Sequence, residues 1–176
     1  MADTESETSS PFWRFSLGFY RRPGVADACI ALQDGCGVDV NILLFLLWLA
    51  TARRCVPPAA AQAVCTKAGP WRDDVVVPLR TLRRRLKDGS SLVDRGTAEL
   101  FRTRIKAVEL ESERLQQEAL FALAAGLATE STATVAAAAR ANVAAYEHAM
   151  ARAFTPAAVD VLLAALPAGE PGAGTG

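Results

Sequence analysis

A helix-length stretch from Asp39 to Arg54 constrains the fold more than any other part of the sequence. The nine consecutive residues 42–50 at its centre are all apolar. A helix built from them is apolar around its whole circumference and must be surrounded, either by lipid or by other helices. Only about a dozen residues separate Asn41 from Arg53, fewer than the ~20 that cross a hydrocarbon core. We therefore expect this segment to be the central helix of a soluble domain.

The composition favours one domain with no net electrostatic field. The chain has 176 residues, about half of them apolar, which suits a single core. Nineteen basic residues balance nineteen acidic ones, so nucleic acid or an anionic membrane would have to be bound by a local patch. The acidic, Ser/Thr-rich start resembles no signal peptide, which predicts a cytoplasmic protein without membrane contact. We expect one helical domain over 10–166, with disordered tails at 1–9 and 167–176.

Proline and glycine mark where helices should begin and end. Ser10 followed by Pro11 is a capping residue with proline at the first helical position. Gly69-Pro70 predicts one helix end and a new start, and Pro78, inside the next apolar pattern, predicts a kink. No segment shows sustained alternation of apolar and polar residues. The sequence therefore predicts an all-α fold, an irregular bundle of seven or eight helices.

The longest predicted helix covers about 97–128, with Asp94 and Thr97 as possible caps. Its charges alternate in sign at helical spacing, which is typical of a solvated outer face. The next predicted helix, about 132–154, is rich in alanine, so we expect it to pair closely and antiparallel with the long one. The predicted buried stripe of the long helix consists of Phe101, Ile105, Val108, Leu115 and Ala122.

Chemistry-bearing residues form no specific catalytic or metal-binding motif. The four cysteines include no CxxC pair and His148 is the single histidine, so we expect free, buried thiols, with a Cys29/Cys36 redox pair as the alternative. Glu109 and Glu113 lie one helical turn apart, but the sequence offers no third carboxylate to complete a cation site. We predict no metal and no cofactor, which leans against an enzyme without excluding one.

The strongest local charge signal is a basic ridge formed by Arg80, Arg83, Arg84 and Lys87. One interpretation is that the ridge contacts phosphates of nucleic acid. The other is that it pairs with the acids of the long helix, Glu109 among them. No aromatic residues interleave with the ridge, as stacking on single strands requires, so internal pairing is the favoured interpretation.

Polar and aromatic residues near the apolar helix form a second candidate site: Trp13, Asp39, Asn41, Trp48 and Trp71. Polar side chains buried at the start of an apolar helix need hydrogen-bond partners. The ordinary explanation is that Asp39 caps its own helix and bonds a neighbouring loop. The alternative is a small-ligand pocket floored by Trp48.

Several segments resemble a bacterial, chiefly proteobacterial, family of helical proteins known as domain of unknown function 2390. The segments that carry the likeness include Phe-Trp-Arg-Phe-Ser-Leu at 12–17, Arg-Pro-Gly-Val at 22–25, Gly-Val-Asp-Val-Asn at 37–41, Pro-Trp at 70–71 and Lys-Ala-Val-Glu-Leu-Glu-Ser-Glu-Arg at 106–114. The likeness extends over about residues 12–120. It implies a small all-helical bacterial protein and assigns no activity or site residue.

Three hypotheses for the function remain open. The favoured one is a non-enzymatic domain that binds another protein, because no reaction-specific motif is present and the long helix is highly charged. The second is a ligand-binding protein or enzyme with a pocket around Asp39, Asn41 and Trp48. The third is nucleic-acid binding through the basic ridge.

Overall fold

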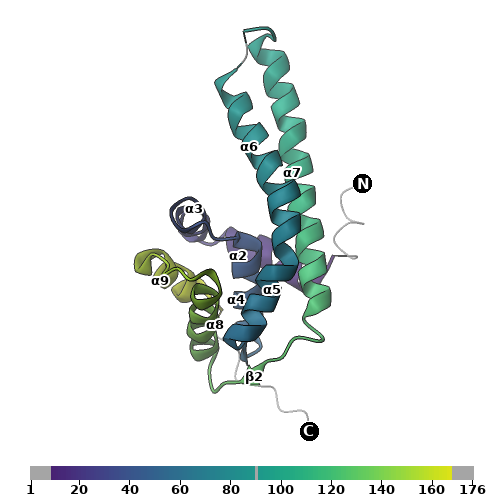
Figure 1. Ribbon diagram of the computed structural model, residues 1–176. Helices are drawn as coiled ribbons and strands as arrows, with labels where there is room; N and C mark the ends of the chain where they lie inside the picture. Colours follow the sequence, from purple (N-terminus) through teal and green to yellow (C-terminus); the bar gives the residue numbers. More distant parts are fainter. Residues whose placement is uncertain (1–8, 90, 168–176) are drawn as a thin grey trace.

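A computed structural model describes residues 9–89 and 91–167, and this part of the chain confirms the all-α prediction (Figure 1). The helices are α2 (Pro11–Tyr20), α3 (Val25–Cys36), α4 (Val40–Thr51), α5 (Pro58–Trp71), α6 (Val77–Arg85), α7 (Arg95–Leu123), α8 (Val135–Met150) and α9 (Pro156–Ala165). A π-helical turn, η1 (Arg72–Val76), joins α5 to α6, and a 3-10 turn, η2 (Leu86–Asp88), follows α6. The disordered tails predicted at 1–9 and 167–176 lie almost wholly outside the described residues.

Helix α4 is the centre of the core, as its sequence predicts. Asp39 caps it, accepting hydrogen bonds from the backbone N–H of Asn41 at 2.9 Å and of Ile42 at 3.4 Å. Every residue of α4 from 41 to 50 is buried except the half-buried Trp48. Helices α8, α7 and α2 pack around it. No helix among the described residues combines the length and apolarity needed to span a bilayer.

A minimal antiparallel sheet, which the sequence pattern does not reveal, holds the exit of α4 in place. Strands β1 (Arg54–Cys55) and β2 (Glu130–Ser131) are two residues each. Beside them the fully buried Asn142 of α8 donates to the carbonyl oxygens of Leu46 and Arg54 and accepts from the N–H of Val56. One amide side chain thus satisfies three buried backbone groups and fixes α8 against α4.

Pro70 in α5 and Pro78 in α6 do not interrupt the helical path. Pro70 lies inside α5, so the helix end predicted at Gly69-Pro70 is wrong. The irregularity falls instead in η1, directly before Pro78, where the N–H of Val77 bonds to the carbonyl of Arg72, five residues back. A π-helical turn absorbs the backbone positions that proline leaves without an N–H donor. Counting α5 and α6 as one helix or two gives seven or eight helices in the described residues.

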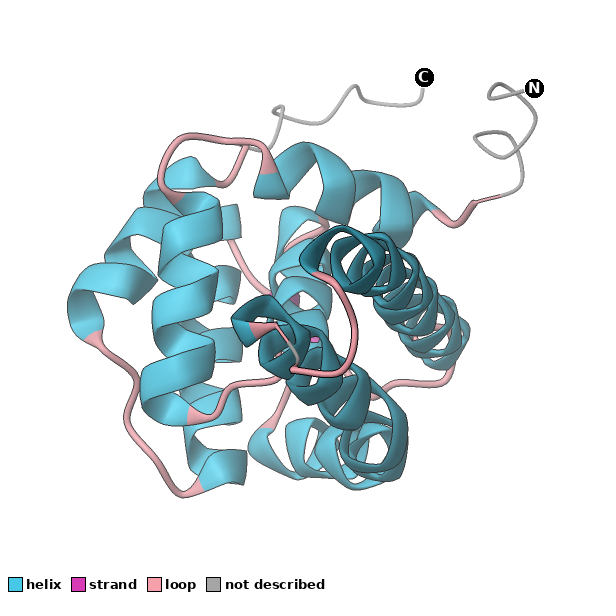
Figure 2. Ribbon diagram, turned by 90° about the horizontal axis from the view of Figure 1, so that it is seen from above, coloured by secondary structure: helices cyan, strands magenta, loops and turns pink. Residues whose placement is uncertain are grey.

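The predicted antiparallel pairing of the long helix with its successor is wrong. Helix α7 packs most extensively against α6, and the two form a hairpin that projects from the body (Figure 1). Figure 2 views this hairpin nearly end-on, in front of the other helices. Helix α8 packs against α4 and α5 instead. Its small side chains approach α4 closely, and α4 has the largest apolar surface to cover.

The orientation of α7 about its axis is also opposite to the sequence prediction. Phe101, Val108 and Leu115, predicted to be buried, are 49%, 52% and 45% exposed. Ala122 is exposed as well, and of the predicted stripe only Ile105 is half-buried. The residues of α7 that are buried are largely polar: Glu109, Ser112, Gln116 and Gln117, together with Ala98 and Leu120. Helix α7 therefore turns a polar face inward and an apolar face outward.

Candidate functional site

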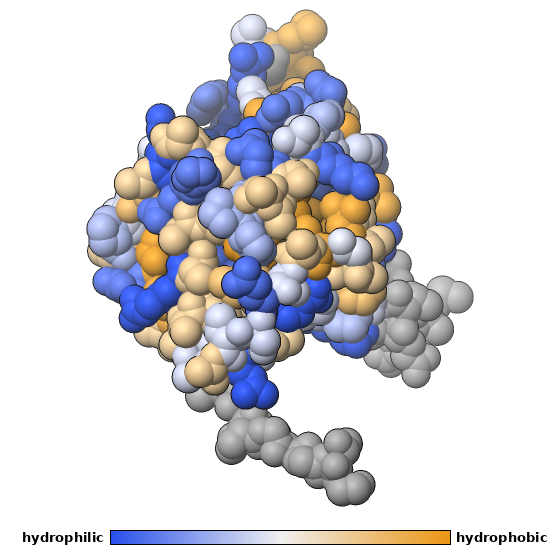
Figure 3. All heavy atoms as spheres, turned by 60° about the horizontal axis from the view of Figure 1, so that its bottom comes forward, coloured by the Kyte–Doolittle hydropathy of each residue, from blue (hydrophilic) through white to orange (hydrophobic). Residues whose placement is uncertain are grey.

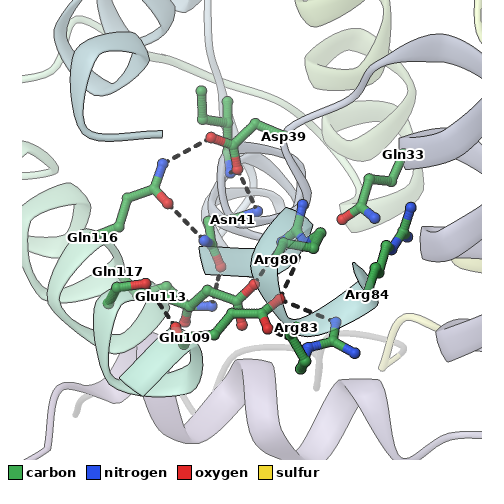
Figure 4. Close-up of polar contacts among 12 residues, drawn as sticks. Gln33, Asp39, Asn41, Arg80, Arg83, Arg84, Glu109, Glu113, Gln116 and Gln117 are labelled. Carbon is green, nitrogen blue, oxygen red and sulfur yellow. Dashed lines mark hydrogen bonds and ion pairs between the residues drawn. The ribbon is translucent and has the colours of Figure 1, made fainter. Parts of the chain in front are cut away.

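At the base of the hairpin, three amide side chains and one carboxylate form a hydrogen-bonded series that we call the amide chain (Figure 4). Gln117 Nε2 donates to Asn41 Oδ1 at 2.8 Å. Asn41 Nδ2 donates to Gln116 Oε1 at 2.7 Å, and Gln116 Nε2 donates to Asp39 Oδ2 at 2.7 Å. All four residues are less than 10% exposed. The chain joins the start of α4 to the inward face of α7.

The carboxylate of Asp39 sets the direction of the amide chain. Both carboxyl oxygens of Asp39 accept N–H bonds, so Gln116 turns its NH₂ group toward Asp39 and its oxygen toward Asn41. The same requirement passes along the chain and leaves Gln117 with its NH₂ group toward Asn41. Gln117 Oε1 is then the free end, and it is a buried atom without a hydrogen-bond partner among the described residues.

Asp39 is almost completely enclosed by other groups. Its backbone N–H donates to the hydroxyl oxygen of Tyr146 at 3.0 Å, and that hydroxyl donates to the Asp39 carbonyl at 3.3 Å. Burial raises the pKa of the Asp39 carboxyl above its usual range, and the hydrogen bonds from Gln116 and the backbone N–H of Asn41 offset part of the increase. Burial likewise raises the pKa of the Tyr146 hydroxyl. Asp39 therefore acts as a cap and an acceptor in a dry environment.

The basic ridge and the acids of α7 pair with each other, as the favoured interpretation holds. Arg80 donates to Glu109 at 3.2 Å and to Glu113 at 2.7 Å, and Arg83 donates to both oxygens of Glu109. Glu109 is 5% exposed, so these pairs are sheltered from solvent. Burial raises the pKa of Glu113, against the lowering effect of Arg80. The hydrogen bond to Glu109 raises the pKa of the Arg83 guanidinium.

The other two members of the ridge lie further out. Arg84 pairs with Asp34 of α3 at 3.1 Å, and both side chains are about half exposed. That bond holds the pKa of the Asp34 carboxyl below its usual range. Lys87 is exposed in η2, near the tip of the hairpin. The ridge is thus divided between internal ion pairs and solvent, and it presents no continuous row of free cations.

A pocket of about 470 Å³ opens where α2, α3, α4, α6 and α7 meet. Asn41 and Gln117 lie at its polar side, with the ion pairs of Arg80 and Arg83 beside them. Its apolar lining includes Trp13, Tyr20, Ile30, Leu44 and Leu110. Arg84 and Lys106 add positive charge to the lining. A volume of this order suits a small organic molecule.

The structure brings together only part of the predicted aromatic and polar site. Trp13 and Asn41 line the pocket, whereas Asp39 lies behind it, at the far end of the amide chain. Trp48 packs among the rings of Phe12, Phe45 and Phe121.

Trp71 does not line the pocket either. Its indole N–H donates to the carbonyl of Ser112 at 3.0 Å. Sequence reasoning missed Gln116 and Gln117 entirely. Their signal was a polar stripe on the long helix, at 109, 112–113 and 116–117, that recurs at helical spacing.

The cysteines have the properties of packing residues. All four are free thiols. Burial raises the pKa of Cys29 to about 12 and that of Cys65 to about 11, which disfavours the reactive thiolate. Cys36 lies beside the hydroxyl of Thr155 at 3.8 Å. No group of three or more potential metal ligands occurs among the residues that the structure describes.

The outward face of α7 forms a second candidate surface, which we call the outer stripe: Phe101, Val108 and Leu115. These residues recur every seven positions, so they align along the helix. Leu100, 70% exposed, extends the apolar surface near the tip. Figure 3 brings the opposite end of the molecule forward, where hydrophilic and hydrophobic residues are intermingled, and shows apolar spheres at the receding hairpin tip.

Comparison with known proteins identifies a family without assigned activity. A family model described as "Protein of unknown function (DUF2390)" matches residues 11–120, which include α2 to α6 and most of α7. The matched region thus contains the amide chain, the pocket and the outer stripe. No curated protein and no solved structure matches the chain.

Proposed function

The chain belongs to the DUF2390 family of proteins of unknown function, and we propose that it works by binding another protein through the outer stripe of α7. The observation that carries the proposal is the reversed burial of this helix, with polar side chains inside and apolar side chains about half exposed outside. Contiguous exposed apolar surface in a folded protein commonly marks an interaction site. A projecting hairpin also leaves this surface accessible to a large partner.

The spacing and the charges of α7 define the chemistry of the partner. Three apolar residues at seven-residue intervals suit an amphipathic helix laid along α7. Glu109 and Glu113 face inward and pair with α6, so they take no part in this surface. The first half of α7 carries Arg95, Arg104 and Lys106 besides the Glu99–Arg102 pair, and the second half carries Glu118 besides the Glu111–Arg114 pair. The fitting helix is therefore apolar on one face, acidic beside the first half of α7 and basic beside the second half. A second copy of α7, running antiparallel, meets this description.

The test compares two surface variants of the full chain. In the double variant Val108→Ser/Leu115→Ser the outer stripe becomes polar, and in the control Leu17→Ser a leucine that is 39% exposed changes on α2, outside the outer stripe. Light scattering after size-exclusion chromatography measures self-association. Affinity capture from the source cells, followed by reconstitution with the purified partner, measures association with a different protein.

We expect the double variant to weaken either association by at least about tenfold, because each apolar side chain loses contact area with the partner. The control variant should bind like the wild type. A wild-type chain that is monomeric and binds no reconstituted partner contradicts the proposal. So does a partner whose affinity is the same for the wild type and the double variant.

A further inference from the structure

We propose that the pocket beside the amide chain binds a small organic acid that carries an N–H or O–H donor and an apolar body. This site is separate from the outer stripe and does not depend on the function proposed above. Three features of the pocket specify the three parts of such a ligand: an unpartnered acceptor, guanidinium groups that retain unused N–H donors, and an apolar wall.

The unpartnered acceptor is Gln117 Oε1. Gln117 is 3% exposed and lines the pocket, and its oxygen lacks a hydrogen-bond partner within the described residues. A buried acceptor without a partner costs free energy. The oxygen is itself covered by neighbouring atoms, so a ligand donor reaches it only when the surrounding side chains shift slightly, and the hydrogen bond then formed stabilises the complex. The amide does not present its NH₂ group instead, because Gln116 donates to Asp39 and this bond fixes the direction of the whole amide chain.

The uncommitted donors belong to the arginines of α6. Arg80 uses Nε and Nη2, and Arg83 uses Nε and Nη2, in their bonds to Glu109 and Glu113. Each guanidinium has five N–H donors, so both retain donors beyond those that the glutamates take. Arg84 and Lys106 bring the lining to four cations, against Glu109 and Glu113 in the lining and Asp34 beside Arg84, which leaves an excess of one positive charge. The surplus positive charge favours an anion, and a guanidinium binds a carboxylate in a planar, two-point geometry.

The apolar part of the ligand is specified by the apolar residues of the lining, which form the wall. These are Trp13, Tyr20, Ile30, Leu44 and Leu110, of which Tyr20, Ile30 and Leu110 are between 38% and 52% exposed. These side chains can be covered by a ring or a branched aliphatic group. The acceptor, the guanidinium groups and the wall occur in one pocket, so one small molecule can engage all three.

The test uses NMR titration of the full chain with three probes that share a phenylpropanoyl skeleton. N-acetyl-L-phenylalanine has the carboxylate, the N–H donor and the ring. 3-Phenylpropionate lacks the acetamido group and with it the N–H donor, and N-acetyl-L-phenylalaninamide lacks the charge. We expect N-acetyl-L-phenylalanine to bind at least about threefold more tightly than either of the others, with shifts at the side-chain amide signals of Asn41 and Gln117.

Three variants separate the contributions. Gln117→Leu should remove the preference for N-acetyl-L-phenylalanine over 3-phenylpropionate. Arg84→Gln, a change at a half-exposed side chain, should weaken both acids about twofold to fivefold and leave the neutral amide unaffected.

Asp39→Asn provides the most specific variant. Its oxygen must still cap α4, so its NH₂ group faces Gln116 and the amide chain reverses. Gln117 then presents N–H groups to the pocket, and the preference for the donor-bearing acid should be lost although Gln117 itself is unchanged.

The inference is overturned if none of the three probes shifts the pocket resonances at millimolar concentration. It is overturned equally if 3-phenylpropionate or the amide binds as tightly as N-acetyl-L-phenylalanine, or if Asp39→Asn and Gln117→Leu both keep the wild-type preference. If Gln117→Leu does not fold, as its amide and methyl spectra reveal, the Arg84→Gln variant and the comparison of probes on the wild type carry the test.

Discussion

Helices α4 and α7 lie against each other at the base of the hairpin, yet they follow opposite rules of burial. Helix α4 is apolar on every side and is enclosed by its neighbours, with Asn41 the only polar side chain buried within it. Helix α7 buries a mainly polar face and leaves the outer stripe about half exposed among charged residues. The contrast shows that a buried helix face need not be the most apolar face available. What decides is whether the groups already buried nearby require polar partners.

Two sets of buried groups require such partners at the base of the hairpin. Asp39 and Asn41 are fixed there by the start of α4, and Gln116 and Gln117 satisfy them. Arg80 and Arg83 approach from α6, and Glu109 and Glu113 together pair with them. An apolar face of α7 turned toward these groups would leave buried polar atoms unpaired, at about 1–3 kcal/mol each. That cost exceeds what burying a few half-exposed apolar side chains contributes.

The largest expected effect comes from the centre of α4. Phe45 is 0% exposed and packs edge-on against Phe12, so Phe45→Ala should lower the free energy of unfolding by about 3–5 kcal/mol. Phe101→Ala on the outer stripe, with the same change of side chain, should lower it by less than about 1 kcal/mol. Urea denaturation of both variants measures the difference. Similar losses for the two variants would mean that the outer stripe is buried in the free protein.

The second effect concerns the polar face of α7. Gln116→Leu keeps the size of the side chain but leaves Asp39 and Asn41 without one partner each. We expect a loss of about 1–3 kcal/mol in the free energy of unfolding, although the substitution makes α7 more apolar. The exposed Gln62→Leu on α5 is the matched control and should change stability by less than about 0.5 kcal/mol. A stabilised Gln116→Leu variant would show that the amide chain does not orient α7.

A smaller effect is the pH dependence contributed by Asp39. Burial raises the pKa of its carboxyl in the folded state, so the folded protein holds this proton more strongly than the unfolded chain does. The contribution of Asp39 to stability therefore falls as pH rises through the range above the usual aspartate pKa of about 3.9. The difference in unfolding free energy between the wild type and Asp39→Asn, measured by denaturation at pH 4 to 8, should shift toward the variant as pH rises. A difference that shifts toward the wild type would contradict the direction of this pKa change.

The smallest effect on stability is expected on the outward face of α7. Val108→Ser should change the free energy of unfolding of the isolated chain by less than about 0.5 kcal/mol, because its side chain already contacts solvent. The same substitution should weaken association with the proposed helical partner. Thermal unfolding at low protein concentration separates the two properties. A large loss of stability under those conditions would place Val108 in an interface that exists even in dilute solution.

The sequence by itself determined the features that rest on local chemistry. The apolar run of α4 has no polar face that could be turned toward water, so this helix must be buried on all sides. The cap at Asp39 follows from the need to satisfy the first N–H groups of a helix. The all-α class and the first helix from Pro11 follow in the same way. The helix boundaries around Pro70 and Pro78 could not be predicted from the sequence in this way. The helical path continues through both prolines, with a π-helical turn just before Pro78.

Only the tertiary structure decided which face of α7 is buried, which helix it pairs with and which residues share a pocket. The sequence of α7 offers an apolar stripe through Phe101 and a polar stripe through Gln116, and local patterning favours burying the first. The choice depends on groups more than 25 residues away, Asp39, Asn41, Arg80 and Arg83, whose partners are fixed once the chain is folded. Hydrogen bonds and ion pairs across such separations leave no periodic signal in a single sequence. The free-energy cost of leaving these buried polar groups without partners is nonetheless large enough to decide which face of α7 is buried.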